Sequence, residues 1–238
     1  MKVDVFIPCF IDQLRPETAL NMIKVLERAG CQVNYNAEQT CCGQAAFNAG
    51  FWDDAREVGE KLLHEVSNNN MVCPGASCVG MIRNSYDLLF QNSSYHNKYR
   101  QLQKRTFELS EFLVDVLKVT QLGSMLFGKA TYHDSCSALN ECKIKSQPRK
   151  LLKNVQGLEL IEMKDCETCC GFGGTFTIKY ENISVAMAEQ KVENAMATGA
   201  EYLISTDYAC LMHMDAYIKN KNIPIKALHL ADVLAQGL

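Results

Sequence analysis

Cysteine is the residue type in this sequence whose number and spacing point to chemistry. The chain has 238 residues and twelve cysteines, and a chain of this length can bury a core without disulfide bonds. The apolar stretch at the N-terminus contains Asp4 and is predicted to be a buried strand rather than a signal peptide. We therefore expect a cytoplasmic protein whose thiols serve metal, cluster or redox chemistry.

Eight of the cysteines form a pattern that occurs twice. Each copy has one cysteine, then a Thr-Cys-Cys-Gly sequence, then a further cysteine, and equivalent cysteines are 127, 128 and 132 positions apart. The eight are Cys9, Cys41, Cys42 and Cys78 in the first copy and Cys136, Cys169, Cys170 and Cys210 in the second. This near-constant offset predicts a tandem duplication, with one cysteine-rich domain over residues 1–123 and another over residues 124–238.

Four thiolates in each copy suit either zinc or an iron–sulfur cluster. The glycine after each cysteine pair, Gly43 or Gly171, allows a tight turn in which both sulfur atoms can face one centre. The paired C-x-x-C knuckles of structural zinc sites are absent from the aligned positions, and so is the C-x-x-C-x-x-C sequence of bacterial ferredoxins. Iron and zinc both remain open at this point.

Strands and helices are predicted to alternate in both halves. The first half has predicted strands over Val3–Pro8, Gln32–Tyr35 and Met71–Cys73 and helices over Pro16–Arg28, Trp52–Val66 and Val79–Leu89. The second has predicted strands over Ala130–His133, Leu158–Met163, Tyr202–Ser205 and Ile225–Leu228 and helices over Gln147–Asn154, Asn182–Thr198 and Leu211–Lys219. This alternation is typical of βαβ units with a mainly parallel sheet. We expect two Rossmann-like α/β halves related by a pseudo-twofold axis.

Every cysteine of the repeated pattern comes directly after a predicted strand. The carboxyl ends of parallel strands meet at one edge of a sheet. We therefore expect the four thiols of each half to converge at the edge of their own sheet, where they could hold a metal or a cluster.

Composition and charge exclude several other classes of protein. The formal net charge is −3, whereas a nucleic-acid-binding surface normally needs a basic face. No apolar run approaches the length that spans a bilayer, so no direct membrane insertion is expected. The sequence contains no G-x-G-x-x-G motif for a nicotinamide or flavin nucleotide.

The spacing resembles a known family. In each copy, 31 or 32 residues separate the single cysteine from the Cys-Cys-Gly sequence, and 35 or 39 residues separate that cysteine pair from the further cysteine. This spacing is similar to that of the cysteine-rich CCG domain. This domain occurs in duplicate in the cysteine-rich subunit of heterodisulfide reductase. The chain resembles most the lactate utilization protein A family, through Cys-Cys-Gly-Phe-Gly-Gly-Thr-Phe at 169–176, Gly-Ala-Ser-Cys at 75–78 and the sequence at 151–160.

This resemblance implies an iron–sulfur oxidoreductase subunit that takes part in the oxidation of L-lactate to pyruvate. It implies one cluster per half, cubane or non-cubane, held by the eight repeated cysteines. It also implies two partner subunits, one of them carrying ferredoxin-like clusters. Two alternatives are a thiol–disulfide reductase of the heterodisulfide type and a zinc-stabilised structural or interaction subunit.

Some residues are weaker candidates for ligands. The heterodisulfide reductase subunit ends each motif with C-x-x-C, where this chain has Met81 and His213. His213 could still ligate, as could Cys73 and Cys166, although neither cysteine has a cysteine at the equivalent position of the other half. His133 and Asp134 precede Cys136 and could tune a cluster from outside its ligand set, or could cap the turn that follows the strand.

Overall fold

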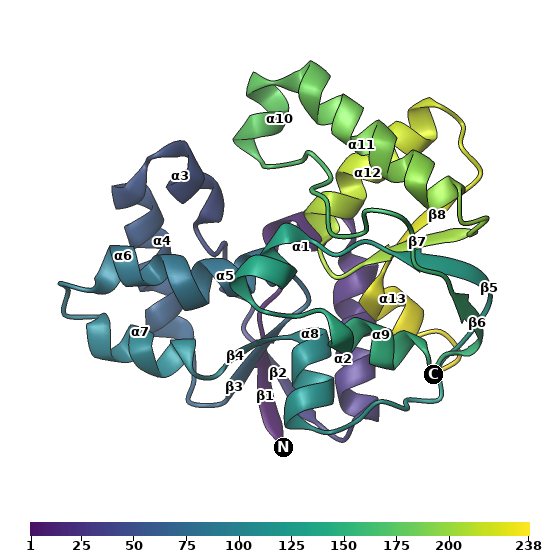
Figure 1. The fold of residues 1–238 in the computed structure, drawn as a ribbon. Coiled ribbons are helices and arrows are strands. Elements are labelled where there is room, and N and C mark those ends of the chain that lie inside the picture. Colours follow the sequence, from purple (N-terminus) through teal and green to yellow (C-terminus); the bar gives the residue numbers. More distant parts are fainter.

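The computed structural model describes residues 1–238 and contains two four-stranded parallel sheets, one in each half of the chain (Figure 1). The strand order is β2-β1-β3-β4 in the first sheet and β6-β5-β7-β8 in the second. The strands are β1 (Lys2–Val5), β2 (Gln32–Tyr35), β3 (Asn70–Cys73), β4 (Thr106–Glu108), β5 (Met125–Tyr132), β6 (Gln156–Leu160), β7 (Tyr202–Ser205) and β8 (Lys226–His229). Since the second sheet repeats the order of the first, the predicted α/β architecture with two equivalent halves is confirmed.

Helices connect the strands and cover the sheets. In the first half they are α1 (Cys9–Leu14), α2 (Pro16–Arg28), α3 (Gln44–Ala49), α4 (Trp52–Glu65), α5 (Ala76–Gly80), α6 (Tyr86–Phe90), α7 (His96–Gln103) and α8 (Leu109–Glu111). In the second they are α9 (Ser146–Leu152), α10 (Thr175–Lys179), α11 (Glu181–Met196), α12 (Tyr208–Asn220) and α13 (Leu230–Leu234). Three π-helical segments are η1 (Met81–Ser85), η2 (Phe112–Val116) and η3 (Ser137–Glu141). None of the helices combines the length and apolar character that crossing a bilayer requires.

Three of the predicted elements match the structure residue for residue. The bounds predicted for α2, β2 and β7 are those observed. The predicted helix over Val79–Leu89 is present as α5, η1 and α6 in succession. Strand β4 was not predicted, because its three residues are too few to show a period of two. Helices α3 and α10, which follow the two Cys-Cys-Gly turns, were not predicted either.

The two halves contact each other reciprocally. Helix α1 of the first half contacts α12 of the second. Their equivalents, η3 of the second half and α5 of the first, also contact each other. In the same way α2 packs on α13, while α9 packs on α8. When element i of one half meets element j of the other, and j meets i, the interface has the form of a twofold dimer interface. The expected pseudo-twofold relation is therefore present.

The largest apolar core joins the two halves. One cluster of 24 buried residues includes Val3 and Val5 from β1 as well as Tyr132 from β5 and Ile204 from β7. The C-terminal helix α13 supplies four of its members. The halves thus share a core, and the domain boundary between residues 123 and 124 stays a prediction.

Asp232 forms the principal polar link between α13 and α2. Its carboxylate accepts hydrogen bonds from Thr18 Oγ1 at 3.0 Å and from Asn21 Nδ2 at 2.9 Å. Thr18 is buried, so its hydroxyl has no access to water if this partner is lost.

We expect Asp232→Ala to lower the free energy of unfolding by about 1–3 kcal/mol, the cost of leaving a buried donor unpaired. Urea unfolding followed by circular dichroism measures this change. Asp53→Ala is the matched control, because Asp53 forms an exposed ion pair with Arg56, and such pairs contribute at most about 1 kcal/mol. Equal effects from the two substitutions would contradict the importance of this link.

Candidate metal centre

The structure places the repeated cysteines directly after the strands. Cys9 begins α1, and Cys136 immediately precedes η3. Cys78 and Cys210 lie in the first turns of α5 and α12. The backbone N–H groups at the start of a helix stabilise negative charge, so they would help to hold a thiolate once a metal has displaced its proton. Four of the eight sulfur atoms therefore start from a position suited to a metal ligand.

The cysteine pairs lie in turns that depend on glycine. Gly43 and Gly171 have φ angles of +81° and +91°, in the left-handed region. A Cβ atom at Gly171 would lie 2.6 Å from the Ser184 carbonyl oxygen, so no other residue fits there without movement of the backbone. The amide of Gly43 donates to Cys41 Sγ, and that of Gly171 donates to Cys169 Sγ, both at 3.4 Å. The two turns are therefore built alike.

Within the first half the thiols lie close together without forming disulfides. The Sγ atoms of Cys42 and Cys78 are 3.4 Å apart, and those of Cys9 and Cys41 are 3.8 Å apart. All twelve cysteines are free. Thiolates around one tetrahedral zinc ion, with bonds of about 2.3 Å, lie roughly 3.8 Å from each other. The spacing thus suits a shared metal centre, and a cluster of several iron ions would need the same ligands further apart.

Both sets of cysteines face one cavity. The cavity has a volume of about 340 Å³, and all eight repeated cysteines line it. Phe10 from the first half and Phe172 from the second meet there edge to face, with ring centroids 6.0 Å apart. The sequence predicts each set at the edge of its own sheet and does not indicate that the two edges face each other.

Hydrogen bonds among the thiols lower the pKa of some and raise the pKa of others. Hydrogen bonds from Cys42 and then Cys9 hold the pKa of Cys41 well below its ordinary value. Those from Cys136 and Cys170 do the same for the pKa of Cys169. The same hydrogen bonds raise the pKa of the donating thiols, which are those of Cys9, Cys42, Cys136 and Cys170. A metal that bound here would have to displace the remaining thiol protons, so we expect its affinity to increase as the pH rises.

The weaker candidates from the sequence lie outside the cavity lining. The Cys73 thiol interacts with the backbone of Gly75, whose amide nitrogen and carbonyl oxygen are each 3.4 Å from Cys73 Sγ. Arg149 Nη2 lies 3.9 Å from Cys166 Sγ. His213 Nε2 is 3.0 Å from Ser184 Oγ and 3.1 Å from Ser184 O. Cys31 and Cys142, which are outside the repeated pattern, are buried.

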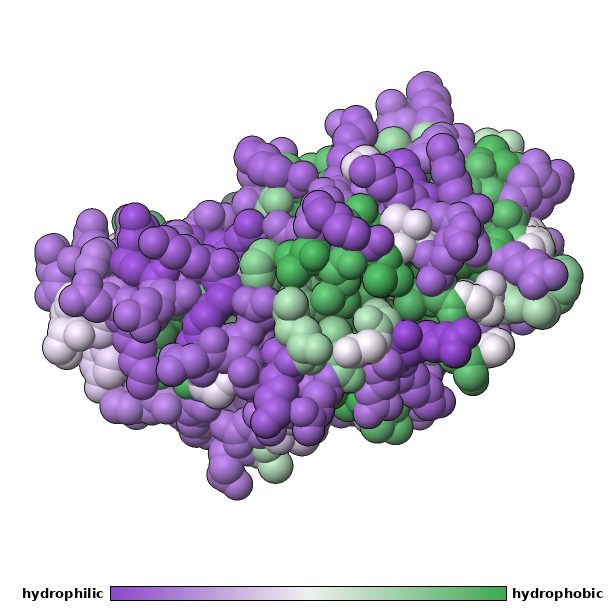
Figure 2. Space-filling model, turned by 90° about the horizontal axis from the view of Figure 1, so that it is seen from below, coloured by the Kyte–Doolittle hydropathy of each residue, from purple (hydrophilic) through white to green (hydrophobic).

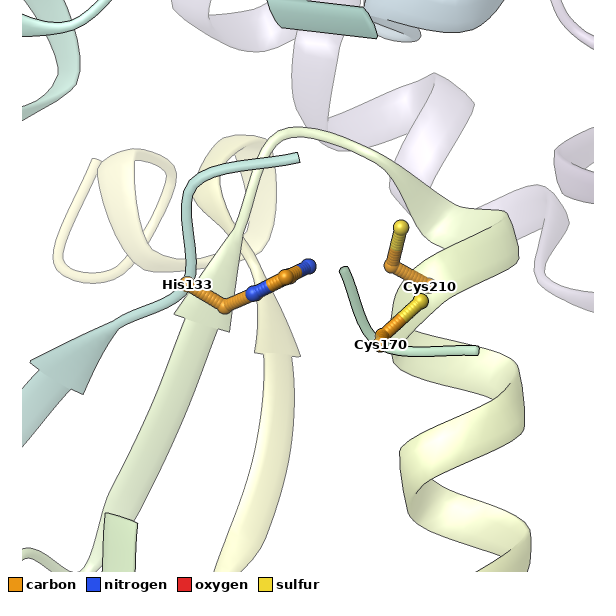
Figure 3. Close-up of side chains that lie close together, drawn as sticks. All are labelled: His133, Cys170 and Cys210. Carbon is orange, nitrogen blue, oxygen red and sulfur yellow. The ribbon is translucent and has the colours of Figure 1, made fainter. Parts of the chain in front are cut away.

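His133 lies closer to the thiols than its place in the sequence indicates. Its side chain is fully buried, and neither ring nitrogen has a hydrogen-bond partner. One ring nitrogen and the Sγ atoms of Cys170 and Cys210 all lie within 4.8 Å of one another, and the ring projects from the end of β5 toward the two thiols (Figure 3). Burial and the nearby ammonium group of Lys191 lower the pKa of His133 to about 3, so the imidazole is neutral. A comparison of the two halves could have drawn attention to His133, because the equivalent residue of the first half is the apolar Phe6.

The donor set fits the kind of group that the sequence suggested. Soft thiolates bind zinc, copper and iron–sulfur clusters rather than magnesium or calcium. A buried imidazole without a hydrogen bond is a further donor beside the second set. The residue types present therefore suit a soft metal ion or an iron–sulfur cluster in each half, and a cluster would hold the thiols further apart than they lie in this structure.

Comparison with known proteins supports this interpretation. Residues 3–83 and 130–215 each match the cysteine-rich domain family called CCG. Lactate utilization protein A of Halalkalibacterium halodurans is 41% identical over 98% of this chain and 96% of its own length. The Geobacillus sp. protein of that name is 39% identical over 98% and 99%. Lactate utilization protein A 2 of Bacillus cereus is 38% identical over 100% and 99%.

A solved structure shares the fold. The crystal structure of a hypothetical protein from Helicobacter pylori matches all of this chain with a TM-score of 0.62 and 12% identity. This chain spans about half of that protein, 49% of its length. At this identity the match supports the fold alone. Since two CCG domains and relatives of about 40% identity cover almost the whole sequence, the chain belongs to the lactate utilization protein A family.

Proposed function

We propose that this chain is an iron–sulfur oxidoreductase subunit that takes part in the oxidation of L-lactate to pyruvate. The observation that carries the proposal is the single cavity lined by eight free cysteines, four from each half. The relatives are named for lactate utilization. Twelve cysteines without a disulfide are typical of proteins in a reducing compartment, which favours the cytoplasm.

The proposed ligands are the cysteines of the repeated pattern. Cys9, Cys41, Cys42 and Cys78 would hold the first cluster, and Cys136, Cys169, Cys170 and Cys210 the second. A bound iron–sulfur cluster would supply a site that takes up and releases electrons. The protein contributes the turns of Gly43 and Gly171, whose amides donate to sulfur atoms and so stabilise their negative charge.

The chain is proposed to act together with two further subunits, one carrying ferredoxin-like clusters. Lactate oxidation removes two electrons and protons from a carbon centre, which is chemistry that an organic cofactor commonly carries. The sequence has no nucleotide-binding glycine motif for such a cofactor. One face of the molecule carries an apolar area within a hydrophilic surface (Figure 2), and exposed apolar patches are common at protein interfaces.

Two alternatives rest on particular observations. The shared cavity could admit a small molecule between the two cysteine sets, as a thiol–disulfide reductase would require. The Sγ to Sγ distances of 3.4 and 3.8 Å suit a single zinc ion, as a structural role would require. Iron and acid-labile sulfide analysis of anaerobically purified protein separates zinc from iron. Disulfide turnover by the reconstituted chain tests the reductase.

Replacing one buried ligand in either half should remove the iron of that half only. We expect Cys42→Ser and Cys170→Ser each to lose about half of the iron per chain after anaerobic reconstitution, because a hydroxyl is a poor ligand for soft metals. Cys31→Ser and Cys142→Ser are the controls, since these buried cysteines lie outside the cavity lining. Equal losses in all four variants would show that the ligand assignment is wrong.

Lactate oxidation should need the assembled complex. We expect the isolated, reconstituted chain to show no lactate-dependent dye reduction, and the activity to appear when the partner subunits are added. The control is dithionite reduction of the isolated chain, which shows that its clusters accept electrons. Rapid lactate turnover by the chain alone would show that the partner subunits are not needed for the reaction.

A further inference from the structure

The two cysteine sets differ in one donor. In the second half His133 joins Cys170 and Cys210 in a group whose ligand atoms are all within 4.8 Å of one another, and all three residues are buried. The equivalent position in the first half, three residues before Cys9, is Phe6, which offers no donor. The backbone is the same at both positions, since the amide of Phe6 donates to Val72 O at 2.9 Å and that of His133 to Ile204 O at 2.8 Å.

The backbone around His133 is held on several sides. The His133 carbonyl oxygen accepts a hydrogen bond from Ser205 Oγ at 3.0 Å. The next amide, that of Asp134, donates to Cys166 O at 3.1 Å. The Asp134 carboxylate is bound by both terminal nitrogens of Arg149, at 2.8 and 2.7 Å. These contacts fix the direction in which the imidazole projects, toward the thiols (Figure 3).

The environment of His133 gives its ring no protein partner. Buried polar groups are nearly always hydrogen-bonded, and an unpaired one costs free energy. Phe6 shows that an apolar ring fills the same place in this fold, so packing alone does not require histidine. Neutral imidazole is a common ligand for transition metals, and a coordinate bond would satisfy one of its two nitrogens.

We propose that His133 is a nitrogen ligand of the metal centre in the second half, beside Cys170 and Cys210. This inference rests on the proposed function, because it takes that centre to be an iron–sulfur cluster. In the second centre His133 would then take the place of one of the four cysteine ligands proposed above, so its ligation would be mixed thiolate and imidazole. The first centre would keep thiolate ligands only.

Mixed ligation has a consequence for the reduction potential. An imidazole is neutral where a thiolate is negative, and histidine ligation raises the potential of an iron–sulfur cluster. The buried ammonium group of Lys191 adds positive charge near the second set, and its influence reaches Cys166 and Cys170. The second centre is therefore the easier of the two to reduce, which gives the pair a direction for electron flow.

Pulsed electron paramagnetic resonance on the full chain tests this ligation. The protein is labelled with ¹⁵N-histidine, carries Cys42→Ser to remove the first cluster, and is reconstituted anaerobically with iron and sulfide and then reduced. We expect strong ¹⁵N hyperfine coupling from a directly bound nitrogen. His133→Phe should abolish this coupling, and His213→Asn, the matched histidine control, should retain it. His133→Cys should retain iron, lose the coupling and lower the midpoint potential.

The outcomes separate the two proposals. If the second half holds iron but shows no nitrogen coupling, or if His133→Phe leaves the coupling unchanged, His133 is not a ligand and the proposed function stands. If the second half takes up no iron at all, both proposals fail. Loss of iron in His133→Phe with recovery in His133→Cys supports ligation, because a folding defect would not be corrected by another donor. Circular dichroism checks that each variant is folded.

Discussion

In both sheets the carboxyl ends of the strands are directed toward the boundary between the halves, and the cysteine-bearing turns follow these ends. The site depends on this constraint. A parallel sheet brings the loops after its strands to one edge, and the reciprocal packing of α1 on α12 and of α5 on η3 brings the two edges together. Without that packing the chain would have two separate thiol sites. With it, eight thiols share one cavity.

The arrangement is held by a core that belongs to neither half alone. Apolar residues from β1, β5 and β7 pack in one cluster with the C-terminal helix α13. Polar contacts reinforce it close to the cysteines: the Asp207 carboxylate accepts from the Ser77 amide at 3.0 Å, and His229 Nε2 lies 3.0 Å from Pro74 O. Both contacts hold the turn that leads to Cys78. The position of the first cysteine set therefore depends on residues of the other half.

Duplication explains why the two halves are alike, so a residue that differs between them indicates where their roles differ. The turns of Gly43 and Gly171 share a conformation and the same amide-to-sulfur hydrogen bond. His133 replaces Phe6 on an equivalent backbone. Two identical clusters would have equal reduction potentials, whereas the proposed His133 ligand would make the two potentials unequal. Unequal potentials would suit the role proposed above, in which the chain passes electrons between partner subunits.

Much of this protein could be predicted from its sequence, because the signals are local. The duplication follows from cysteine spacing, the parallel α/β architecture from alternating periodicity, and the turns from glycine after each cysteine pair. Short elements such as β4 carry too few residues for a pattern. The opposed sheet edges and the shared cavity arise from contacts between residues more than one hundred positions apart, such as Ser77 with Asp207. The role of His133 could not be predicted for the same reason. A buried imidazole in its position can cap its own turn or face thiols from later parts of the chain. Which of the two occurs depends on which strand ends meet, and only the tertiary structure decides that.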